Sequence, residues 1–570
     1  MYPLVKIKQN IAKLINQALG KKLVKATDLI FPPKPEFGDL SLPCFELAKK
    51  YKKTAVEMAE LLVRKTKLDQ WIVATKAIGP YLNFTFNKTK LAQEVINNQI
   101  NKLGVNYGLN QIGAGQRVMI EYSNANTHKA YHVGHLRNLC FGDAVAKILQ
   151  INGYQVIPVS YINDFGIHAA KTIWAYQTFF SKEKLPADKG YFLGQVYSRA
   201  VSELEKDEAA SREILAIMKK IESQGGKEFK LWQKTREWSI NGFSKIYHQL
   251  GIEFEHIFYE SDYLNKGLDL IAKLYKKLFL TKSQGIIIAN LEKYNLGVLP
   301  FLRSDSTALY PVADLPLAIE KFKKYKIDKS IYVVDVRQSL YFKQLFKILE
   351  LLGYKKPMAH LSYEFVKLPS GLISSRAGQV ITYQDLRAEF FKKALSETRQ
   401  RHRNWSGEKI KSVATKLTNG AIKFEMVKVG ADKIITFDIN QALRFDGFTA
   451  AYLQYTCARI NSIIRKSKLK KSQFNNFRAD NLTEDKENNL ILKLAKYPEV
   501  VAVAAKNYQP AEIAQFLFNL AQSFNDYYHS LPVLKAKKET KLARLALISA
   551  VSQVIANGLT LFGIEVMEKM

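Results

Sequence analysis

Val118-Met-Ile-Glu-Tyr122 is a short apolar run that predicts a buried strand, and the polar loop after it ends at His132-Val-Gly-His135. Apolar residues then recur at helical spacing from Leu136 to Leu149. A second strand is predicted over Val156–Ile162, where Pro158 indicates a bulge or a sheet edge. Strand, loop, helix and strand within about 45 residues form a βαβ unit, so we expect a doubly wound, Rossmann-like parallel sheet.

The loop-to-helix junction at His132 lies where such a sheet binds phosphates. Free backbone N–H groups and the helix dipole favour anions there, and Gly134 lets a nucleotide approach the backbone. His132 and His135 are three apart and could both donate hydrogen bonds to phosphate oxygens. A zinc site on His128, His132 and His135 is the less favoured alternative, because neither an HExxH carboxylate nor a cysteine accompanies them.

A second candidate phosphate loop covers Ser370–Gly378, which is rich in small and hydroxyl residues and has Arg376 as its cation. Such a loop can close over a triphosphate. Taken alone, an ordinary hairpin turn is the better interpretation. The order of the two loops along the chain makes the nucleotide interpretation stronger.

Composition limits the class of protein. A chain of 570 residues predicts about three or four domains. Its net charge of +33 suits a polyanionic partner, although a genome-wide bias toward lysine explains it equally well. Three scattered cysteines argue against disulfides and suit a reducing cytoplasm. We expect no membrane span, because the best candidate, Ala543–Phe562, contains Arg544 and several polar residues and predicts an amphipathic helix.

Patterning divides the chain into three parts. Residues 1–116 mix helical and strand signals and predict an N-terminal α+β domain. Residues 117–406 carry the sheet signals, with a charged helical insertion over about 171–290. Residues 407–570 predict helices only.

The two loops resemble the HIGH and KMSKS signatures of class I aminoacyl-tRNA synthetases, and the run Glu121–Arg137 resembles the arginyl-tRNA synthetases in particular. Further segments that resemble this family are Ser304–Asp314, Tyr332–Phe342, Phe448–Arg459 and Ala543–Met570. The resemblance spans nearly the whole chain. It implies a class I catalytic domain, a C-terminal all-α anticodon-binding bundle and an N-terminal domain that contacts the tRNA elbow.

The resemblance implies an arginine–tRNA ligase. Its substrates would be L-arginine, ATP as a Mg²⁺ complex and arginine tRNA, with no zinc and no organic cofactor. The family is usually monomeric, and we expect a cytoplasmic enzyme without membrane contact. The rivals are another class I synthetase, for glutamine, glutamate or cysteine, and a non-catalytic tRNA-binding paralogue.

The amino-acid pocket follows from the same resemblance. A guanidinium is a planar fork of donors, so its pocket needs a carboxylate for bidentate contact. Carried over by position, Asp314 and Tyr310 would hold the guanidinium, while Glu121, Asn126 and Gln338 would hold the rest of arginine, including its ammonium. From spacing alone, Tyr310 and Asp314 would more often form a helix-start hydrogen bond.

Two departures from the family pattern affect this assignment. The stretch Leu372–Arg376 lacks both lysines of the second signature, so Lys129 is expected to substitute and to bind phosphates with Arg376, Ser374 and Ser375. Ala313 stands where many relatives have arginine, which removes one secondary contact.

The expected RNA contacts lie at both ends of the chain. Tyr452, Tyr455 and Arg459 share one helix face, which by spacing alone is more often core. The resemblance assigns this face to anticodon bases, which stack on aromatic rings. The complete predicted set is Tyr452, Tyr455, Arg459, Tyr528 and Met570 for the anticodon, with Asn83 of the Gly79–Phe84 stretch for the elbow.

Overall fold

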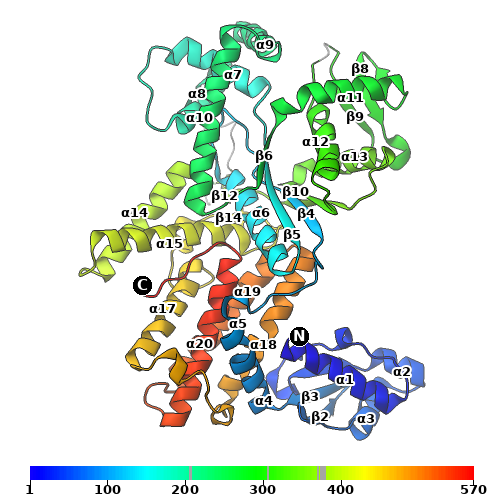
Figure 1. Ribbon diagram of the computed structural model, residues 1–570, viewed down its shortest axis with the longest axis vertical. Helices are drawn as coiled ribbons and strands as arrows, with labels where there is room; N and C mark the ends of the chain where they lie inside the picture. Colours follow the sequence, from blue (N-terminus) through cyan, green and yellow to red (C-terminus); the bar gives the residue numbers. More distant parts are fainter. Residues whose placement is uncertain (205–207, 305–306, 369–370, 373–380) are drawn as a thin grey trace.

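The computed structural model describes residues 1–204, 208–304, 307–368, 371–372 and 381–570. The α/β part of the chain lies above a helical bundle, and the N-terminal part projects to one side of that bundle (Figure 1). The three-part α/β architecture expected from the sequence is confirmed.

The N-terminal part is a three-stranded antiparallel sheet packed against helices, as its mixed patterning predicted. The strand order is β1-β3-β2. Its elements are α1 (Pro3–Leu19), β1 (Leu40–Pro43), α2 (Phe45–Tyr51), α3 (Ala55–Lys65), β2 (Ile72–Ile78) and β3 (Tyr81–Phe86). Helix α3 begins with a capping box, in which the Thr54 hydroxyl accepts the N–H of Glu57.

The central sheet has five parallel strands in the order β11-β10-β4-β5-β6. They are β4 (Arg117–Glu121), β5 (Gln155–Ile162), β6 (His256–Tyr259), β10 (Lys329–Asp335) and β11 (Met358–Tyr363). Strands β4 and β5 are neighbours, which confirms the predicted βαβ unit. Pro158 lies in an interior strand without a bulge, at the point where pairing with β6 begins. Its carbonyl accepts the N–H of Glu255 at 2.9 Å, and no N–H of its own is needed there.

Helix α6 (Val133–Ile151) connects β4 to β5 and is buried along most of its length. Gly142 permits its close approach to the strand, because a Cβ there would lie 2.3 Å from the Tyr122 side chain. This contact fixes the height of the helix start above the sheet, and with it the position of His132.

The expected helical insertion over about 171–290 is only partly correct. Helices α7 (Ile167–Ala175), α8 (Lys189–Leu204), α9 (Glu208–Glu222) and α10 (Gly226–Leu250) do pack together. Strand β6, however, belongs to the central sheet, and its four residues are too short to show a period in the sequence. After it come α11 (Leu264–Lys276), β7 (Thr281–Ser283) and β8 (Ile286–Asn290), the last two forming a small antiparallel sheet with β9 (Val298–Leu302).

The remaining elements of the α/β part border the central sheet or lead out of it. They are α12 (Pro311–Lys324), α13 (Ser339–Leu351), β12 (Val366–Leu368), β13 (Gly371–Leu372) and α14 (Tyr383–Arg401). Strand β12 pairs with β13 and with β14 (Ile435–Thr436). The α/β part and the helical part therefore share a three-stranded sheet.

The C-terminal part is helical, as predicted. Its long helices are α15 (Gly407–Val427), α17 (Ala450–Lys466), α18 (Asp485–Asn507), α19 (Pro510–Ser530) and α20 (Lys538–Thr560). Helix α20 is the single helix of the described residues that is long and apolar enough to cross a membrane, and 72% of its most apolar window is buried inside the protein. The sequence predicts an amphipathic helix here, but α20 is buried on most sides at the centre of the bundle. Arg544 can lie in this interior because it pairs with the buried carboxylate of Glu487.

Candidate functional site

Two adjoining pockets open at the carboxyl ends of the central strands, where doubly wound sheets bind ligands. The first, of about 390 Å³, is lined by His132, Gly134 and His135, and we call it the histidine pocket. The second, of about 580 Å³, is lined by Asp314 and Glu121, and we call it the carboxylate pocket. Both pockets are bordered by the shared residues Asn124, Asn126, Val334, Arg337 and Gln338.

In the histidine pocket the two imidazoles are held by the helix start itself. His132 is the N-cap of α6, and its Nδ1 accepts the N–H of Gly134 at 3.1 Å. The Nδ1 of His135 accepts the N–H of His132 at 3.2 Å. In a neutral imidazole whose Nδ1 is an acceptor, the proton is on Nε2. A Cβ at Gly134 would lie 3.0 Å from the His132 ring, so glycine also leaves room for that ring.

Both histidines are neutral near pH 7. Burial, with the positive charges of Lys129 and Arg337 nearby, lowers the pKa of His132 to about 4. Burial, with His132 and Lys129 nearby, lowers the pKa of His135 well below its usual value. The pocket therefore presents two neutral N–H donors with fixed tautomers.

The lysine expected to substitute for the second signature is close to both rings. Burial and the charge of Lys171 lower the pKa of Lys129, whose Nζ lies 5.2 Å from the centre of the Tyr197 ring. The third histidine of this stretch has a different role. Both ring nitrogens of His128 bond threonine hydroxyls, those of Thr127 and Thr235, at 2.8 Å each. His128 thus ties the loop to helix α10 and points no nitrogen at the other two rings.

The second predicted phosphate loop is described only at its two ends. Gly371 and Leu372 form β13, and Ile381 accepts the N–H of Val133 at 3.4 Å. Thr382 forms a bridge with His132. The chain directly after the second signature stretch therefore meets the helix start, while Ser374, Ser375 and Arg376 of the stretch itself lie outside the described residues.

The carboxylate pocket contains all five residues predicted to bind the amino acid. They are Glu121, Asn126, Tyr310, Asp314 and Gln338. Tyr310 is 62% exposed and caps helix α12, and Asp314 is one turn further along. Ala313, the departure from the family pattern, packs into the core at 1% exposure and does not line the pocket.

Asp314, which lines this pocket, and Glu260, which lies beside it and accepts a hydrogen bond from the lining residue Asn163 at 3.1 Å, both have raised pKa values. Burial, with the nearby charge of Glu121, raises the pKa of Asp314 to about 6, although Tyr341 donates a hydrogen bond to it. Burial, with the charges of Asp314 and Asp164 nearby, raises the pKa of Glu260 to about 8. A buried pair of this kind is stabilised by a cation that enters between them.

Glu260 is a residue that the sequence reasoning missed. It follows β6 directly, at the same edge of the sheet, and its negative charge raises the pKa of Tyr310 after the larger effect of burial. The available signal was a polar residue directly after a short aromatic strand. That strand falls within the segment 171–290, where the sequence predicts helices. Arg337, which borders both pockets, is a further residue that the sequence did not single out, although it lies in the family-like segment Tyr332–Phe342.

Glu121 already has partners in this structure. Its Oε1 accepts a hydrogen bond from Asn124 at 3.0 Å, and its Oε2 forms a buried ion pair with Lys321. Burial opposes a charged lysine there, but the ion pair prevails and raises the pKa of Lys321. An ammonium group thus already occupies one side of Glu121.

The residues predicted to read the anticodon converge on one surface of the bundle. The Arg459 guanidinium lies 5.8 Å from the centre of the Tyr455 ring and 5.2 Å from that of Tyr528. Asn525 bridges them, donating to the Tyr452 hydroxyl at 2.6 Å and accepting from Arg459 at 3.3 Å. All four predicted side chains are partly exposed, so the face is neither pure core nor free surface. Met570 packs against the core of the bundle.

The burial of Asn83 contradicts the prediction that this residue contacts the tRNA. The side chain was expected to reach the tRNA elbow, but it is 3% exposed. Its amide donates to the carbonyls of Lys76 and Tyr81, and its oxygen accepts the Ser41 hydroxyl. An asparagine in the central strand of a sheet is most easily satisfied by its own sheet, so it stabilises the N-terminal fold.

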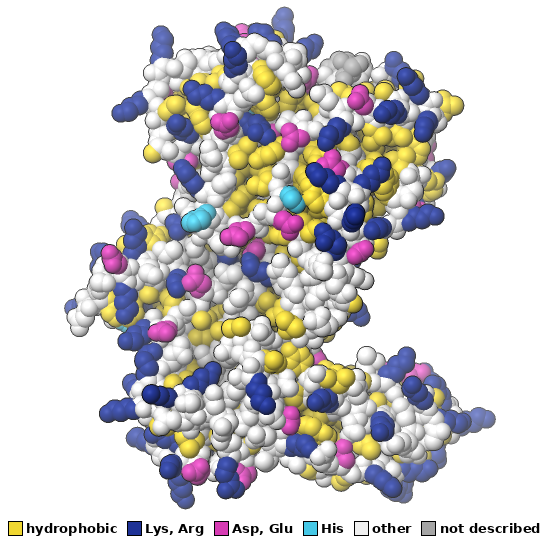
Figure 2. Space-filling model, viewed as in Figure 1, with side chains coloured by type: hydrophobic (Ala, Val, Ile, Leu, Met, Phe, Trp, Pro, Cys, Tyr) yellow, Lys and Arg dark blue, Asp and Glu magenta, His cyan; other side chains and the backbone are white. Residues whose placement is uncertain are grey.

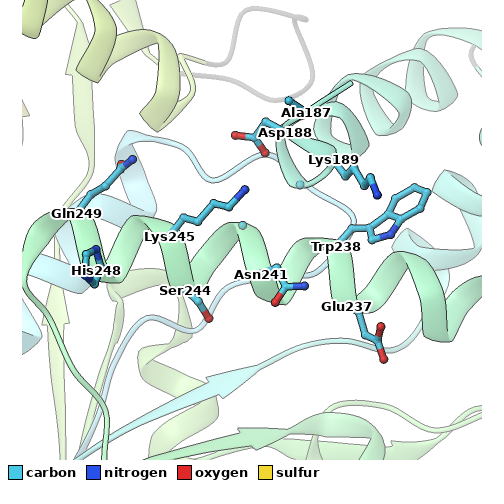
Figure 3. A pocket seen from close by; sticks show the side chains of 12 residues that line it. Ala187, Asp188, Lys189, Glu237, Trp238, Asn241, Ser244, Lys245, His248 and Gln249 are labelled. Carbon is cyan, nitrogen blue, oxygen red and sulfur yellow. The ribbon is translucent and has the colours of Figure 1, made fainter. Parts of the chain in front are cut away.

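A third hollow, of about 750 Å³, lies between α8 and α10, away from every predicted residue. Figure 3 shows Lys245 and His248 on α10 facing the start of α8, with the Lys189 amine near the Trp238 ring. Lysine and arginine side chains are spread over the whole visible face and do not gather at one pocket (Figure 2). On this face the positive charge is therefore dispersed and does not mark one binding site.

Comparison with known proteins gives three matches to family profiles. The profile described as "tRNA synthetases class I (R), catalytic domain" matches residues 98–437. "DALR anticodon binding domain" matches residues 453–570, and "Arginyl tRNA synthetase N terminal domain" matches residues 6–86.

Individual relatives match over the whole length. An arginine–tRNA ligase of Bdellovibrio bacteriovorus is 36% identical over 554 residues, covering 95% of this chain and 94% of the relative. That of Clostridium acetobutylicum is 34% identical over 568 residues, covering 99% and 100%. Among solved structures, the arginyl-tRNA synthetase of Thermus thermophilus superposes with a TM-score of 0.81 at 26% identity, covering 99% of this chain and all of that one.

Proposed function

This chain belongs to the arginyl-tRNA synthetases, and on that basis we propose how its residues divide the reaction. Its activity is that of an arginine–tRNA ligase, a class I enzyme that uses ATP. The observation that supports the assignment of roles is the adjacency of the two pockets, one with neutral N–H donors and one with buried carboxylates.

The histidine pocket binds ATP, which enters as its Mg²⁺ complex. An arginine carboxylate oxygen attacks the α-phosphorus and pyrophosphate leaves. The Nε2–H groups of His132 and His135 donate to the phosphate oxygens as negative charge builds on them. Lys129 and Arg337 add positive charge from two sides, and Arg376 with Ser374 and Ser375 completes the phosphate contacts as the family pattern implies. No side chain acts as a nucleophile, so the rate comes from positioning and electrostatics.

The carboxylate pocket selects arginine by charge and shape. Asp314 receives the guanidinium, with Tyr310 at the mouth, and Glu260 adds negative charge from behind the lining residue Asn163, which donates a hydrogen bond to it. Asn126 and Gln338 orient the α-amino and carboxylate end. Glu121 accepts from the substrate ammonium with the lone pairs that Asn124 and Lys321 leave free. Citrulline and glutamine bind poorly, because neither neutralises the buried carboxylates.

The terminal ribose hydroxyl of arginine tRNA then takes the arginyl group, and AMP leaves. The face with Tyr452, Tyr455, Arg459 and Tyr528 contacts the anticodon, and Met570 supports it from the end of the chain. We place the domains at residues 1–116, 117–406 and 407–570, and we propose a monomer that acts in the cytoplasm. Asn83 is not among the proposed RNA contacts, because its side chain is buried in its own sheet.

The decisive experiment is arginine-dependent pyrophosphate exchange, measured with and without arginine tRNA. Exchange with arginine but not with glutamine, glutamate or cysteine is expected. Asp314→Ala should abolish exchange, whereas Asp446→Ala, which removes an exposed carboxylate paired with Arg444, should leave it unchanged. If no arginine-dependent exchange is observed with or without tRNA, the chain is a non-catalytic relative, contrary to this proposal.

A further inference from the structure

Arg137 is an arginine buried to 1% exposure, and within the part of the chain that the structure describes its guanidinium bonds backbone carbonyls and no carboxylate. It lies one turn after His132 on α6 and donates to four backbone carbonyls instead. The acceptors are Lys433 at 2.9 Å, Gly430 and Ala431 at 3.1 Å each, and Phe365 at 3.5 Å. Buried carbonyls at such a junction need donors, and a planar fork with fixed geometry supplies all four at once.

These carbonyls belong to two chain segments that lead to different parts of the protein. Phe365 precedes β12 and β13, which lead into the second signature stretch. Residues 430–436, which we call the linking segment, lead from α15 toward the RNA-facing helix α17. The two segments also bond each other, because the N–H of Glu364 donates to Ala431 and the N–H of Ile435 donates to Phe365. Arg137 therefore joins the signature helix, the approach to the second signature stretch and the linking segment.

Arg137 and the approach to the second signature stretch form one wall of the histidine pocket, and the linking segment lies behind that wall, bonded to both. Arg137, Tyr363, Phe365 and Val366 line this pocket, and none of them lines the carboxylate pocket. Burial lowers the pKa of Arg137 to about 10, so the guanidinium stays protonated at neutral pH. A displacement of the linking segment would thus change the shape of the histidine pocket and leave the carboxylate pocket intact.

We propose that Arg137 is a positioning residue for ATP, which gives the histidine pocket its shape only while the linking segment is held against α6. This inference rests on the proposed assignment of the histidine pocket to ATP. It makes the placement of the helical bundle a condition for tight ATP binding. Lysine cannot substitute, since its ammonium has three donors on one atom and cannot span carbonyls of two segments.

The test uses Arg137→Lys and Arg137→Gln in the full-length enzyme, with KM and kcat measured by pyrophosphate exchange. The KM for ATP should rise about tenfold or more, the effect of losing one or two charge-assisted hydrogen bonds. The KM for arginine should stay within about twofold. Hydrogen exchange should quicken at the amides of Glu364 and Ile435, whose acceptors Arg137 orders.

Arg544→Lys is the matched control. Arg544 is also buried, at 7% exposure, and it bonds Glu487 and the carbonyl of Pro532 inside the bundle, away from the linking segment. It should lower thermal stability without changing either KM.

A purely structural role for Arg137 would lower stability and the active fraction with both KM values unchanged, and that result would overturn the proposal. If the Arg137 variants do not fold, insertion of one glycine after Asp432 displaces the same carbonyls and should raise the KM for ATP alone. An insertion without effect on that KM would also overturn it. The proposed function fails separately, if wild-type enzyme shows no arginine-dependent exchange.

Discussion

The imidazole rings of His132 and His135 stack, with centroids 3.8 Å apart and planes 21° apart, and each ring accepts a backbone N–H through its Nδ1 atom. Two histidines three apart on a helix are often drawn as a pair of charged phosphate ligands. Here the first turn of α6 fixes both as neutral Nε2–H donors. They act as one preorganised unit, because each ring limits the rotation of the other.

The paired rings predict the kinetics of histidine variants. His132→Ala and His135→Ala should each lower kcat for pyrophosphate exchange by about 10²–10³-fold, as for other donors to a developing oxyanion. The double variant should lose less than the product of the two, since the residues act together. Because both pKa values lie below neutrality, kcat should not titrate with either histidine between pH 6 and 8. Multiplicative losses would show that the two rings act independently.

We expect the Asp314 carboxylate to destabilise the free protein although arginine activation requires it. Its folded pKa, raised by burial from 3.8 to about 6, lies above the unfolded value, so the stability of the free protein falls as the pH rises from about 4 to about 6, and the full penalty is present above about pH 6. Asp314→Asn should therefore abolish arginine activation and raise the free energy of unfolding at pH 8 by up to about 3 kcal/mol. Thermal unfolding at pH 8 and pH 5 checks the sign, since the gain should shrink at pH 5. A variant less stable than wild type at pH 8 would contradict the account.

Arginine binding should release protons. At pH 7, before arginine binds, Glu260 beside the pocket has a pKa raised by burial to about 8 and is mostly protonated, and a smaller fraction of Asp314 is protonated. A guanidinium between them favours the ionised forms. Titration calorimetry in two buffers with different ionisation enthalpies should therefore give different apparent binding enthalpies at pH 7. Glu260→Gln should reduce the difference, and equal enthalpies at pH 7 in the wild type would show that the guanidinium does not ionise Glu260.

The buried pair Glu121–Lys321 should depend on both partners. Lys321→Met leaves a carboxylate unpaired in the interior and should destabilise the fold by about 3–5 kcal/mol. Glu121→Gln combined with Lys321→Met should restore most of that stability while the KM for arginine stays raised, if Glu121 also receives the substrate ammonium. Arg478→Met, which breaks an exposed pair with Asp480, should change the free energy of unfolding little. Denaturant unfolding and exchange kinetics separate the two effects.

The aromatic face of the bundle should matter for tRNA alone. Tyr455→Ala and Arg459→Gln should raise the KM for tRNA about tenfold, because stacking of one base contributes about 1–3 kcal/mol. The values for ATP and arginine should not change. Tyr275→Ala, on exposed helix α11 of the other half, is the control. A drop in thermal stability with an unchanged KM for tRNA would instead make Tyr455 a core residue.

Sequence reasoning reached the site because its residues follow predictable elements. The strand at Val118–Tyr122 and the helix after His132 have clear periods, and Asp314 lies one turn into a helix that begins with proline. It failed where tertiary contacts determine the role of a residue. Glu260 follows a strand of four residues, too short to show a period, and Asn83 has the polarity of a surface residue although its own sheet satisfies it.

The sequence by itself therefore determined the family and the order of its three parts, and it predicted the residues of both candidate pockets, since these follow from local periodicity and from residues close together in the chain. Tertiary structure alone decided the protonation of His132 and His135, the partnership of Glu121 with Lys321 and the central burial of α20. It also decided the junction at Arg137, whose acceptors lie more than two hundred residues away along the chain. Burial and long-range contact set pKa values and hydrogen-bond partners, and neither is visible in a local pattern.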